Sequence, residues 1–487
     1  MPRAGSQPTL PRLWTLWVAC GALMAALCLG SLARAEDAAA AAGAPPAKAA
    51  EATATEAKPS EAEAAKPRDM TLSWQEASKT TPPPKHYTGG DIWHRDTLSG
   101  DWGGLRNDLA NKGLTIDFGV TQTLQGNLGG GKEFRWPYQG SEDLFINIDT
   151  GKMGLWPGGF LKIHAENRWG NAANLDTGAL LPVNTDSLFP VPGQNTTTLS
   201  EVLFMQFLSP QFGLIMGKIE PRENNVFAHD EKTQFMNMAF VFNPAVVTTL
   251  PQDFLTVGGV AIPTDWLTVT VLVLDSEGQA NVSGFDPDTA FHRGTTVYNN
   301  WEFTIKPLGQ TGHQRLSWTW SDKSRVQFQQ DGRLLLRQYL RFLLGLGPKP
   351  AFQRSDNDWS LMYDFDQFVY TVKDHPDRGF GFFGRFGFTP GVVNPVQDFY
   401  SFGVGAKGLS DARPNDSFGV GYYYLGLSDK LPQFLQRRTE DEKGVELYYN
   451  FAVTPWMHIT PDLQVIDPAA KRIGITTVFG IRLQMDF

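Results

Sequence analysis

The sequence predicts an all-β protein, a transmembrane antiparallel β-barrel of ~16 strands with a short N-terminal helix and a disordered N-terminal extension. Many segments alternate large apolar and polar side chains with the period of 2 that a strand imposes. The chain also opens on an apolar export segment, and the longest later run without charge, residues 233–252, contains Asn237, Asn243 and Pro244. Such a run is too polar for a spanning helix, which leaves strands to cross the membrane.

The final segment, expected as a strand from Thr477 to Phe487, shows the alternation most clearly. Its apolar positions are Phe479, Ile481, Leu483, Met485 and Phe487, and the positions between them are Gly480, Arg482, Gln484 and Asp486. The two preceding segments, residues 445–453 and 457–465, repeat the pattern. A soluble amphipathic sheet alternates in the same way. Three such strands behind an export signal favour a barrel, because in lipid only helices and closed barrels satisfy every backbone group.

The N-terminus reads as two segments that precede the barrel. Residues 1–35 are expected to be a signal peptide, because an apolar stretch follows Arg3 and Arg12 and ends in Ala33-Arg34-Ala35. Both cysteines lie in that stretch, so the mature chain is expected to have no disulfide. Residues 36–87, rich in Ala, Pro, Glu and Lys, have little to bury and are expected to form a disordered periplasmic spacer. Residues 88–487 are assigned to the outer-membrane barrel domain.

The overall charge restricts the partners. The formal net charge is −9, and removal of Arg3, Arg12 and Arg34 with the signal would take it to −12. An acidic chain is a poor ligand for nucleic acid, whose affinity for proteins comes largely from phosphate contacts with Lys and Arg. We therefore expect no nucleic-acid partner.

A short helix is expected just before the first strand. Asp101 is a candidate N-cap, Trp102, Leu105 and Leu109 share one helical face, and Gly113 suits the left-handed position after a helix end. The first strand then begins at Leu114.

From residue 90 to 487 the chain resembles the carbohydrate-selective porins of the OprB family. The opening motif is Leu-x-Gly-Asp-Trp-Gly-Gly-x-Arg-x-x-Leu-x-x-x-Gly over residues 98–113, and later motifs follow in order: Gly217-Lys218-Ile219, Asp366-Gln367, Gly384-Arg385-Phe386-Gly387, Glu446-x-Tyr448-Tyr449 and Thr460-Pro461-Asp462-Leu463-Gln464. The resemblance implies a Gram-negative outer-membrane location and passive diffusion of sugars without a cofactor. The implied partners are monosaccharides or small oligosaccharides, outer-membrane lipid, and an assembly machinery that reads Phe487. The oligomeric state stays open, with a homo-oligomer among the alternatives.

The candidate pore-lining and sugar-binding residues are polar residues expected on the inner face. Lys162, His164, Glu166 and Arg168 share the polar side of one strand, where ionisable groups facing lipid would be very costly. A sugar hydroxyl both donates and accepts, so mixed acids and bases can bind it. Lys218 and Glu220 are expected to close a second strand, and the remaining candidates are Asp366, Arg385, Glu446 and Arg482. A general diffusion porin without sugar selectivity is the alternative.

Two other classes of protein are less consistent with the sequence. An outer-membrane hydrolase could use Asp364 and Asp366, or Glu440 and Glu442, but no Ser/His/Asp set is readable. The eight histidines show no metal-ligand spacing, and we expect neither catalysis nor a metal. A soluble β-protein would not explain one apolar face on nearly every strand.

Two features leave alternatives open. Asp286 and Asp288 lie in a turn that suits either calcium or no ligand, and calcium needs 6–8 oxygens. Arg333, Arg337 and Arg341 lie four apart in an expected long loop, a spacing that favours a short helix, although neighbouring leucines also share strand parity.

Overall fold

The chain forms a closed β-barrel. The computed structural model describes residues 85–188, 196–278, 287–331, 340–341, 344 and 352–487. Sixteen antiparallel strands close the barrel, each paired with its neighbour along the chain, and β1 pairs with β18 to complete the ring. Among the described residues, no helix is both long enough and apolar enough to cross a membrane. The predicted class and strand number are confirmed.

The barrel strands alternate along the chain with turns and loops. They are β1 (Leu114–Gly129), β2 (Tyr138–Asp149), β3 (Gly159–Gly170), β4 (Thr196–Ser209), β5 (Phe212–Ile219), β6 (Phe254–Thr264), β7 (Leu267–Asp275), β8 (Thr295–Ile305), β9 (Gly312–Ser321), β12 (Asp358–Val372), β13 (His375–Phe388), β14 (Val396–Lys407), β15 (Ser417–Leu427), β16 (Glu442–Thr454), β17 (Met457–Asp467) and β18 (Thr476–Asp486). The other elements are α3 (Leu105–Asn111), α4 (Asn174–Thr177), η1 (Thr185–Ser187), α5 (Met238–Val241), η2 (Pro244–Val246), η3 (Pro307–Gly309), β10 (Arg325–Val326), β11 (Arg354–Ser355) and α7 (Gln433–Gln436).

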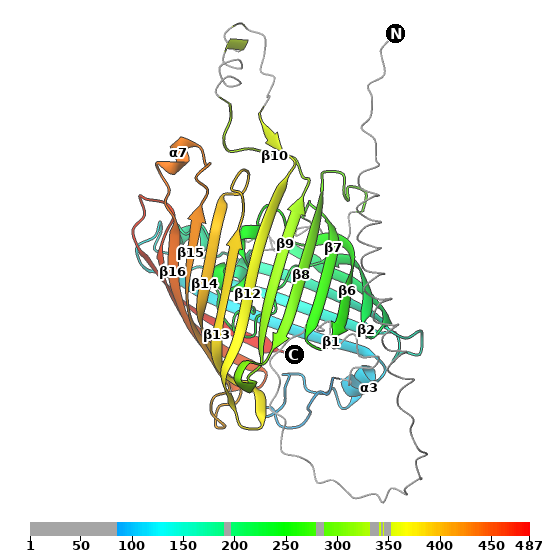
Figure 1. Cartoon of the computed structure of the whole chain (residues 1–487). Coiled ribbons are helices and arrows are strands. Elements are labelled where there is room, and N and C mark those ends of the chain that lie inside the picture. Colours follow the sequence, from blue (N-terminus) through cyan, green and yellow to red (C-terminus); the bar gives the residue numbers. More distant parts are fainter. Residues whose placement is uncertain (1–84, 189–195, 279–286, 332–339, 342–343, 345–351) are drawn as a thin grey trace, which may run out of the picture. The chain divides into compact units, whose positions relative to one another are not determined.

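The two ends of the barrel differ in their connections. Very short turns join β4 to β5, β6 to β7, β12 to β13 and β16 to β17 at the end that carries α3 and the C-terminus, whereas α7 and β10 lie at the opposite end (Figure 1). Outer-membrane barrels have short periplasmic turns and longer extracellular loops. The α3 end is therefore periplasmic.

The alternation of side chains follows the predicted parity. On β18, Arg482, Gln484 and Asp486 are buried, whereas Ile481 is exposed on the outer surface. On β3, the four ionisable side chains from Lys162 to Arg168 are likewise buried on the inner face. Apolar side chains on the outside and polar ones inside are the pattern that lipid around a barrel demands.

The start of the domain differs in two details from the prediction. The N-cap of α3 is Gly104, at φ 94°, and Asp101 instead accepts a hydrogen bond from the Gly103 amide (3.2 Å). Trp102 and Leu105 are exposed, and the helix buries Arg106 and Ala110. The apolar spacing was misleading because the buried contact of α3 is a salt bridge, from Arg106 to Asp117 of β1 (3.1 Å). The left-handed Gly113, at φ 87°, is confirmed.

Two loops pack into the barrel. Loop L2, described here over residues 171–188, carries α4 and η1, and loop L3, residues 220–253, carries α5 and η2. The aromatic side chains of L3 pack against the inner faces of β12 to β16 in a buried core. Phe235 and Phe240 each contact Phe383 edge-to-face, and they make the same kind of contact with Tyr448 and Tyr423 respectively. The uncharged run rejected above as a spanning helix belongs to L3.

Several predictions concern segments that the structure leaves undescribed. The signal peptide, almost all of the spacer, Asp286, Arg333 and Arg337 lie outside the described residues.

Candidate functional site

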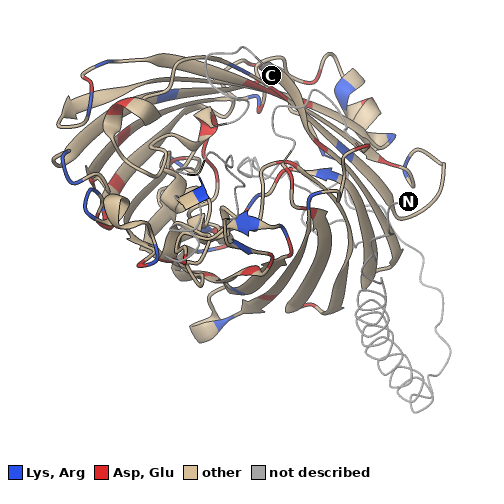
Figure 2. Cartoon of the chain, turned by 90° about the horizontal axis from the view of Figure 1, so that it is seen from above, with Lys and Arg blue, Asp and Glu red and all other residues tan. Residues whose placement is uncertain are grey.

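The inner surface of the barrel is rich in both signs of charge. Figure 2 shows Lys and Arg interspersed with Asp and Glu along the strands and on the loops that the barrel encloses. The ten predicted site residues all lie on this inner side and are at most 9% exposed: Lys162, His164, Glu166, Arg168, Lys218, Glu220, Asp366, Arg385, Glu446 and Arg482. They do not converge on one site. Eight of them form three groups, each of which contacts L2 or L3, whereas Lys162 pairs with Glu201 of β4 (2.6 Å) and Lys218 is buried on β5.

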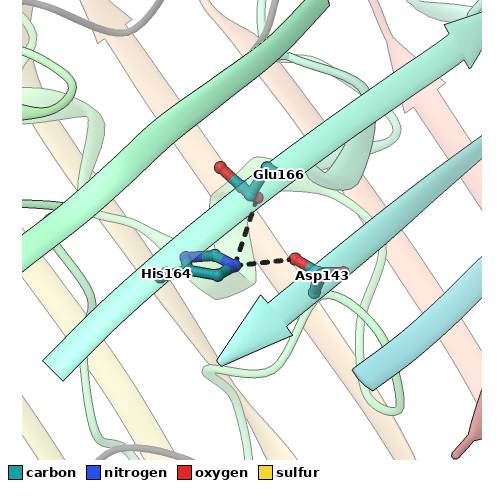
Figure 3. A group of neighbouring side chains, drawn as sticks. All are labelled: Asp143, His164 and Glu166. Atoms are coloured by element: carbon teal, nitrogen blue, oxygen red, sulfur yellow. Dashed lines mark hydrogen bonds and ion pairs between the residues drawn. The ribbon is translucent and has the colours of Figure 1, made fainter. Parts of the chain in front are cut away.

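The first group lies on β2 and β3 and centres on His164. Its Nε2 lies 2.9 Å from Asp143 Oδ1 and its Nδ1 lies 3.0 Å from Glu220 Oε2, while the ring stacks on Phe145 at 4.0 Å between centroids. Figure 3 shows that Asp143 comes from the neighbouring strand and that Glu166 lies two residues further along the histidine's own strand. Glu220 follows β5 by one residue, so it belongs to L3 and not to the strand end expected from the sequence.

Ion pairs join this first group to both inner loops. Arg168 binds Glu166 (2.7 Å) and Asp186 of L2 (2.6 Å). Lys232 of L3 binds Asp143 and lies 3.2 Å from Asp186. Lysine and arginine thus tie L2, L3 and the barrel wall together.

The pKa values of Asp186, Lys232 and Glu220, three paired groups on the loops, are shifted in the directions that favour their charged forms. Although burial opposes the charged form, Arg168 and Lys232 lower the pKa of Asp186, and Asp143 and Asp186 raise the pKa of Lys232. Against the same effect of burial, Arg222 and His164 lower the pKa of Glu220. Burial, aided by Glu220 and Glu166, raises the pKa of Asp253 to about 9. Asp186 and Glu220 are therefore ionised at neutral pH.

The same group has the composition of a metal site but not its charge balance. Ligand atoms of Asp143, His164 and Glu166 lie within 4.8 Å of one another. Each carboxylate, however, already binds a cationic side chain, Lys232 on Asp143 and Arg168 on Glu166. A divalent ion would have to displace these cations, so the arrangement fits ion pairing better than metal binding.

The second group lies on β9, β12 and β13. Arg385 is fully buried; it donates to the carbonyls of Phe240 (2.5 Å) and Ala228 and pairs with Glu223, all in L3. Asp366 accepts from Arg315 (2.8 Å) and lies 2.7 Å from the His313 ring.

The third group lies on β16 and β18. Glu446 accepts hydrogen bonds from the amides of Met236 (2.5 Å) and Asn237 (3.1 Å). Arg482 donates to the carbonyls of Glu231 (2.6 Å) and Gln234 (2.7 Å). Both side chains therefore bind the L3 backbone and fix the path of that loop across the barrel.

A strip of polar residues, all less buried than the three groups except Arg315, lies where L3 meets β8, β9 and β12. Arg315 binds Asp364 (2.6 Å), lies 3.4 Å from Glu302, and donates to the carbonyl of Asn224 (3.1 Å). Asn224, which is exposed, donates to Glu302 (3.1 Å). The polar strip is defined as Arg222, Glu223, Asn224, Glu302, His313, Arg315 and Asp364.

Sequence reasoning missed most of this polar strip. Arg222, Glu223 and Asn224 belong to L3, which has no strand periodicity to reveal which way a side chain points. Glu302 and Arg315 had a usable signal, since each stands on the polar side of an alternating segment. Asp364 was considered only as half of a catalytic pair, and the structure pairs it with Arg315 instead.

Comparison with known proteins identifies the family. The sequence model of one protein family, described as "Carbohydrate-selective porin, OprB family", matches residues 138–487 of this chain. The chain belongs to this family. It is thus a channel of the outer membrane and not a member of an enzyme family.

Individual relatives agree with this assignment. Porin B of Pseudomonas aeruginosa is 27% identical over 129 residues, which cover 23% of this chain and 28% of that relative. The high-pH structure of Pseudomonas putida OprB matches with a TM-score of 0.71 and 21% identity over 82% of this chain and 100% of that one. The low-pH structure of the same protein gives a TM-score of 0.50 at 19% identity over 81% and 99%. At this identity the structures support the shared fold.

Proposed function

We propose that the barrel lets neutral sugars diffuse passively into the periplasm and that the polar strip forms its sugar-selective constriction. The observation that supports this most is the mixture of donors and acceptors along the strip: Arg315 lies between Asp364 and Glu302, and Asn224 joins Glu302 to L3. A sugar hydroxyl can donate to the carboxylates and accept from the guanidinium in the same step. Because the two signs alternate, no strong field of one sign selects ions.

The ten buried candidates have a different role in this proposal. Glu446 and Arg482 bind the backbone of L3. Arg385 binds L3 carbonyls and also pairs with the strip carboxylates Glu223 and Asp364, the latter at 3.3 Å. All three act as positioning residues that fix the loop. His164, Glu166, Arg168, Glu220 and Asp366 support the wall and the loops from the first two groups, and Lys162 and Lys218 are buried in the wall itself. The sugar contacts are assigned to the strip, whose side chains are partly open to solvent except for the buried Arg315.

Single-channel recording with added sugar tests the constriction. Arg315→Ala should shorten sugar-blocking events by about 10-fold or more, because each lost hydrogen bond to a charged group is worth about 1.5–3 kcal/mol. Glu302→Gln should do the same to a smaller degree, and Lys112→Ala, at an exposed site after α3, serves as the control.

A general diffusion porin predicts a different outcome. Sugars would then fail to block even the parent channel, and Arg315→Ala and Glu302→Gln would only shift ion selectivity, in opposite directions. Liposome swelling with glucose, disaccharides and amino acids of similar size would show uptake governed by size alone.

Recognition of Phe487 by an outer-membrane assembly machinery, a partner that the resemblance implies, is also a proposal. Phe487 packs edge-on against Phe118 at 5.6 Å, and its amide donates to the Phe118 carbonyl (2.9 Å). We infer that the assembly machinery recognises this terminal aromatic before the strand is paired. Phe487→Ala should lower the amount of barrel that reaches the outer membrane, as measured by heat-modifiable electrophoresis of membrane fractions. Equal assembly of variant and parent would contradict the inference.

A further inference from the structure

The extracellular rim above β16 to β18 carries a group of unpaired cationic side chains. We define the basic rim as Arg437, Arg438, Lys471 and Arg472. All four are exposed, and within the part of the chain that the structure describes none of them forms an ion pair. This differs from the barrel interior, where Arg168, Lys232 and Arg315 are paired with carboxylates. An unpaired cluster in an acidic chain is a candidate binding site for an anion.

The basic rim is built on two loops that hold each other in place. Residues 428–441, with α7, connect β15 to β16, and residues 468–475 connect β17 to β18. Thr439 and Ala470 form an antiparallel bridge. The Lys471 amide donates to the Arg438 carbonyl (3.1 Å), and the Glu440 amide donates to the Ala469 carbonyl (2.8 Å). The four cations therefore stand at fixed positions and not on independent loops.

The carboxylates nearby do not pair with the four cations, although Lys471 Nζ donates to the Gln436 carbonyl (3.2 Å). Asp441 accepts from the Tyr424 hydroxyl (2.5 Å) and from the Leu427 amide (2.9 Å). Asp467 pairs with Lys443 at 3.3 Å, and Glu442 is buried and binds backbone amides of loop L2. Of the acidic groups on these two loops, Asp429 and Glu440 are the other exposed ones.

The surface directly below the basic rim faces lipid. The outward side chains of β16 to β18 are apolar and exposed, among them Val445, Leu447, Val465 and Ile481. Phe434 on α7 and Ile475 beside β18, each more than 60% exposed, extend this apolar surface up to the basic groups. Cations standing above an apolar band match a molecule with anionic groups at one end and acyl chains at the other.

We propose that the basic rim binds a phosphate-bearing glycolipid of the outer leaflet. The guanidinium groups of Arg437, Arg438 and Arg472 would take phosphate oxygens in bidentate hydrogen bonds, with Lys471 as an additional point charge. The acyl chains would lie along the exposed apolar side chains of β16 to β18. A neutral sugar that passes through the channel gains no Coulomb attraction from these cations. The site is therefore separate from the polar strip and does not rest on the proposed function.

Lipid binding by the full chain in detergent tests the proposal. The probe is an acylated glucosamine disaccharide with two phosphates, the comparison probes are the same lipid without phosphates and inorganic phosphate, and binding is followed by native mass spectrometry. The triple variant R438Q/K471Q/R472Q should lose affinity for the phosphorylated lipid by roughly 10- to 100-fold. The control K112Q/K306Q/K373Q, which removes three exposed cations at the periplasmic end, should bind it like the parent.

Three outcomes would overturn the proposal. Equal affinity of both triple variants would show that the basic rim is not the binding site. Equal binding of phosphorylated and dephosphorylated lipid would show that the cations do not contact phosphate, and equal competition by inorganic phosphate would mean that the apolar surface adds nothing. If R438Q/K471Q/R472Q instead slowed uptake of an anionic sugar acid into liposomes with lipid binding unchanged, the rim would attract solutes and not lipid.

Discussion

At the scale of single residues, the charged and amide side chains inside the barrel divide between two tasks. Fully buried ones such as Arg385 and Arg482 bind backbone carbonyls of L3, whereas partly open ones such as Arg222 and Asn224 are available to a solute. Sequence parity predicts which strand residues point inward, because the side-chain period is 2. It does not predict whether a loop will cover them. Whether a loop covers them depends on contacts between residues far apart in the sequence, such as Glu446 and Met236, which are 210 positions apart.

Arg385→Ala should release L3 from the wall. The substitution leaves the carbonyls of Ala228 and Phe240 without their donor and Glu223 without its cation, and removing one partner of a buried ion pair costs about 3–5 kcal/mol. We expect a lower unfolding temperature and an altered, noisier single-channel conductance. Arg385→Lys retains the charge without the fork of donors and should give an intermediate result. A conductance and stability identical to those of the parent would refute this role.

Asp186→Asn should remove an acid-sensitive cross-link. The lowered pKa means that Asp186 adds stability above the usual aspartate pKa of about 3.9 and loses it as the pH falls through its own lower pKa. The parent should therefore unfold at a higher temperature than Asp186→Asn at pH 5 to 7, and the gap should shrink below about pH 3.9. Electrophoretic unfolding temperatures across this range measure it. A gap that does not change with pH would mean that the carboxylate charge contributes nothing.

At the scale of elements, the N-terminal segment illustrates what a sequence pattern leaves out. The Leu98–Gly113 motif predicted a helix in the correct place, and α3 is found there. The pattern assigned the buried contact to leucine and tryptophan, whereas Arg106 makes it through Asp117 and the Phe487 carbonyl, 381 residues away. Amphipathic spacing reports where apolar groups repeat. It carries no information on a single buried ion pair or on a hydrogen bond to the far end of the chain.

Arg106→Gln should weaken the attachment of α3 to the barrel. The side chain also lies over the ring of Tyr87 at 3.9 Å, so its loss removes a cation–π contact together with the salt bridge. We expect a lower unfolding temperature in detergent with unchanged sugar block. Removal of residues 36–84 serves as the comparison and should have little effect, because that segment has few side chains to bury. If the deletion destabilises the barrel as much as Arg106→Gln does, the spacer prediction is wrong.

At the scale of the whole molecule, the barrel separates a lipid-facing surface from a water-facing one. Leu447 on β16 points outward and is exposed, whereas Asn300 on β8 is half-buried on the inner side and accepts from Ser317 (2.8 Å). This division was predictable from sequence because lipid forces it on every strand alike.

Arginine placed on the two surfaces should have opposite consequences. Leu447→Arg should impair assembly, since a cation facing lipid near the midplane costs about 2–4 kcal/mol. Asn300→Arg should assemble and shift the channel toward anions. Outer-membrane yield and reversal potentials in a salt gradient distinguish the two variants. Equal yields would mean that Leu447 does not face lipid.

The pairing of β1 with β18 also determines the order in which the barrel can form. Each other strand pairs with its neighbours along the chain, so those pairings join segments close in sequence, the longest connections being residues 220–253 and 322–357. The β1–β18 pairing joins residues more than 340 positions apart, and the contacts of Leu98 with Asp486 and of Arg106 with Phe487 span still more. Until those segments meet, two strand edges remain unpaired and open to any other strand. Ring closure is therefore a late step, and a barrel stalled before it is the species most exposed to aggregation.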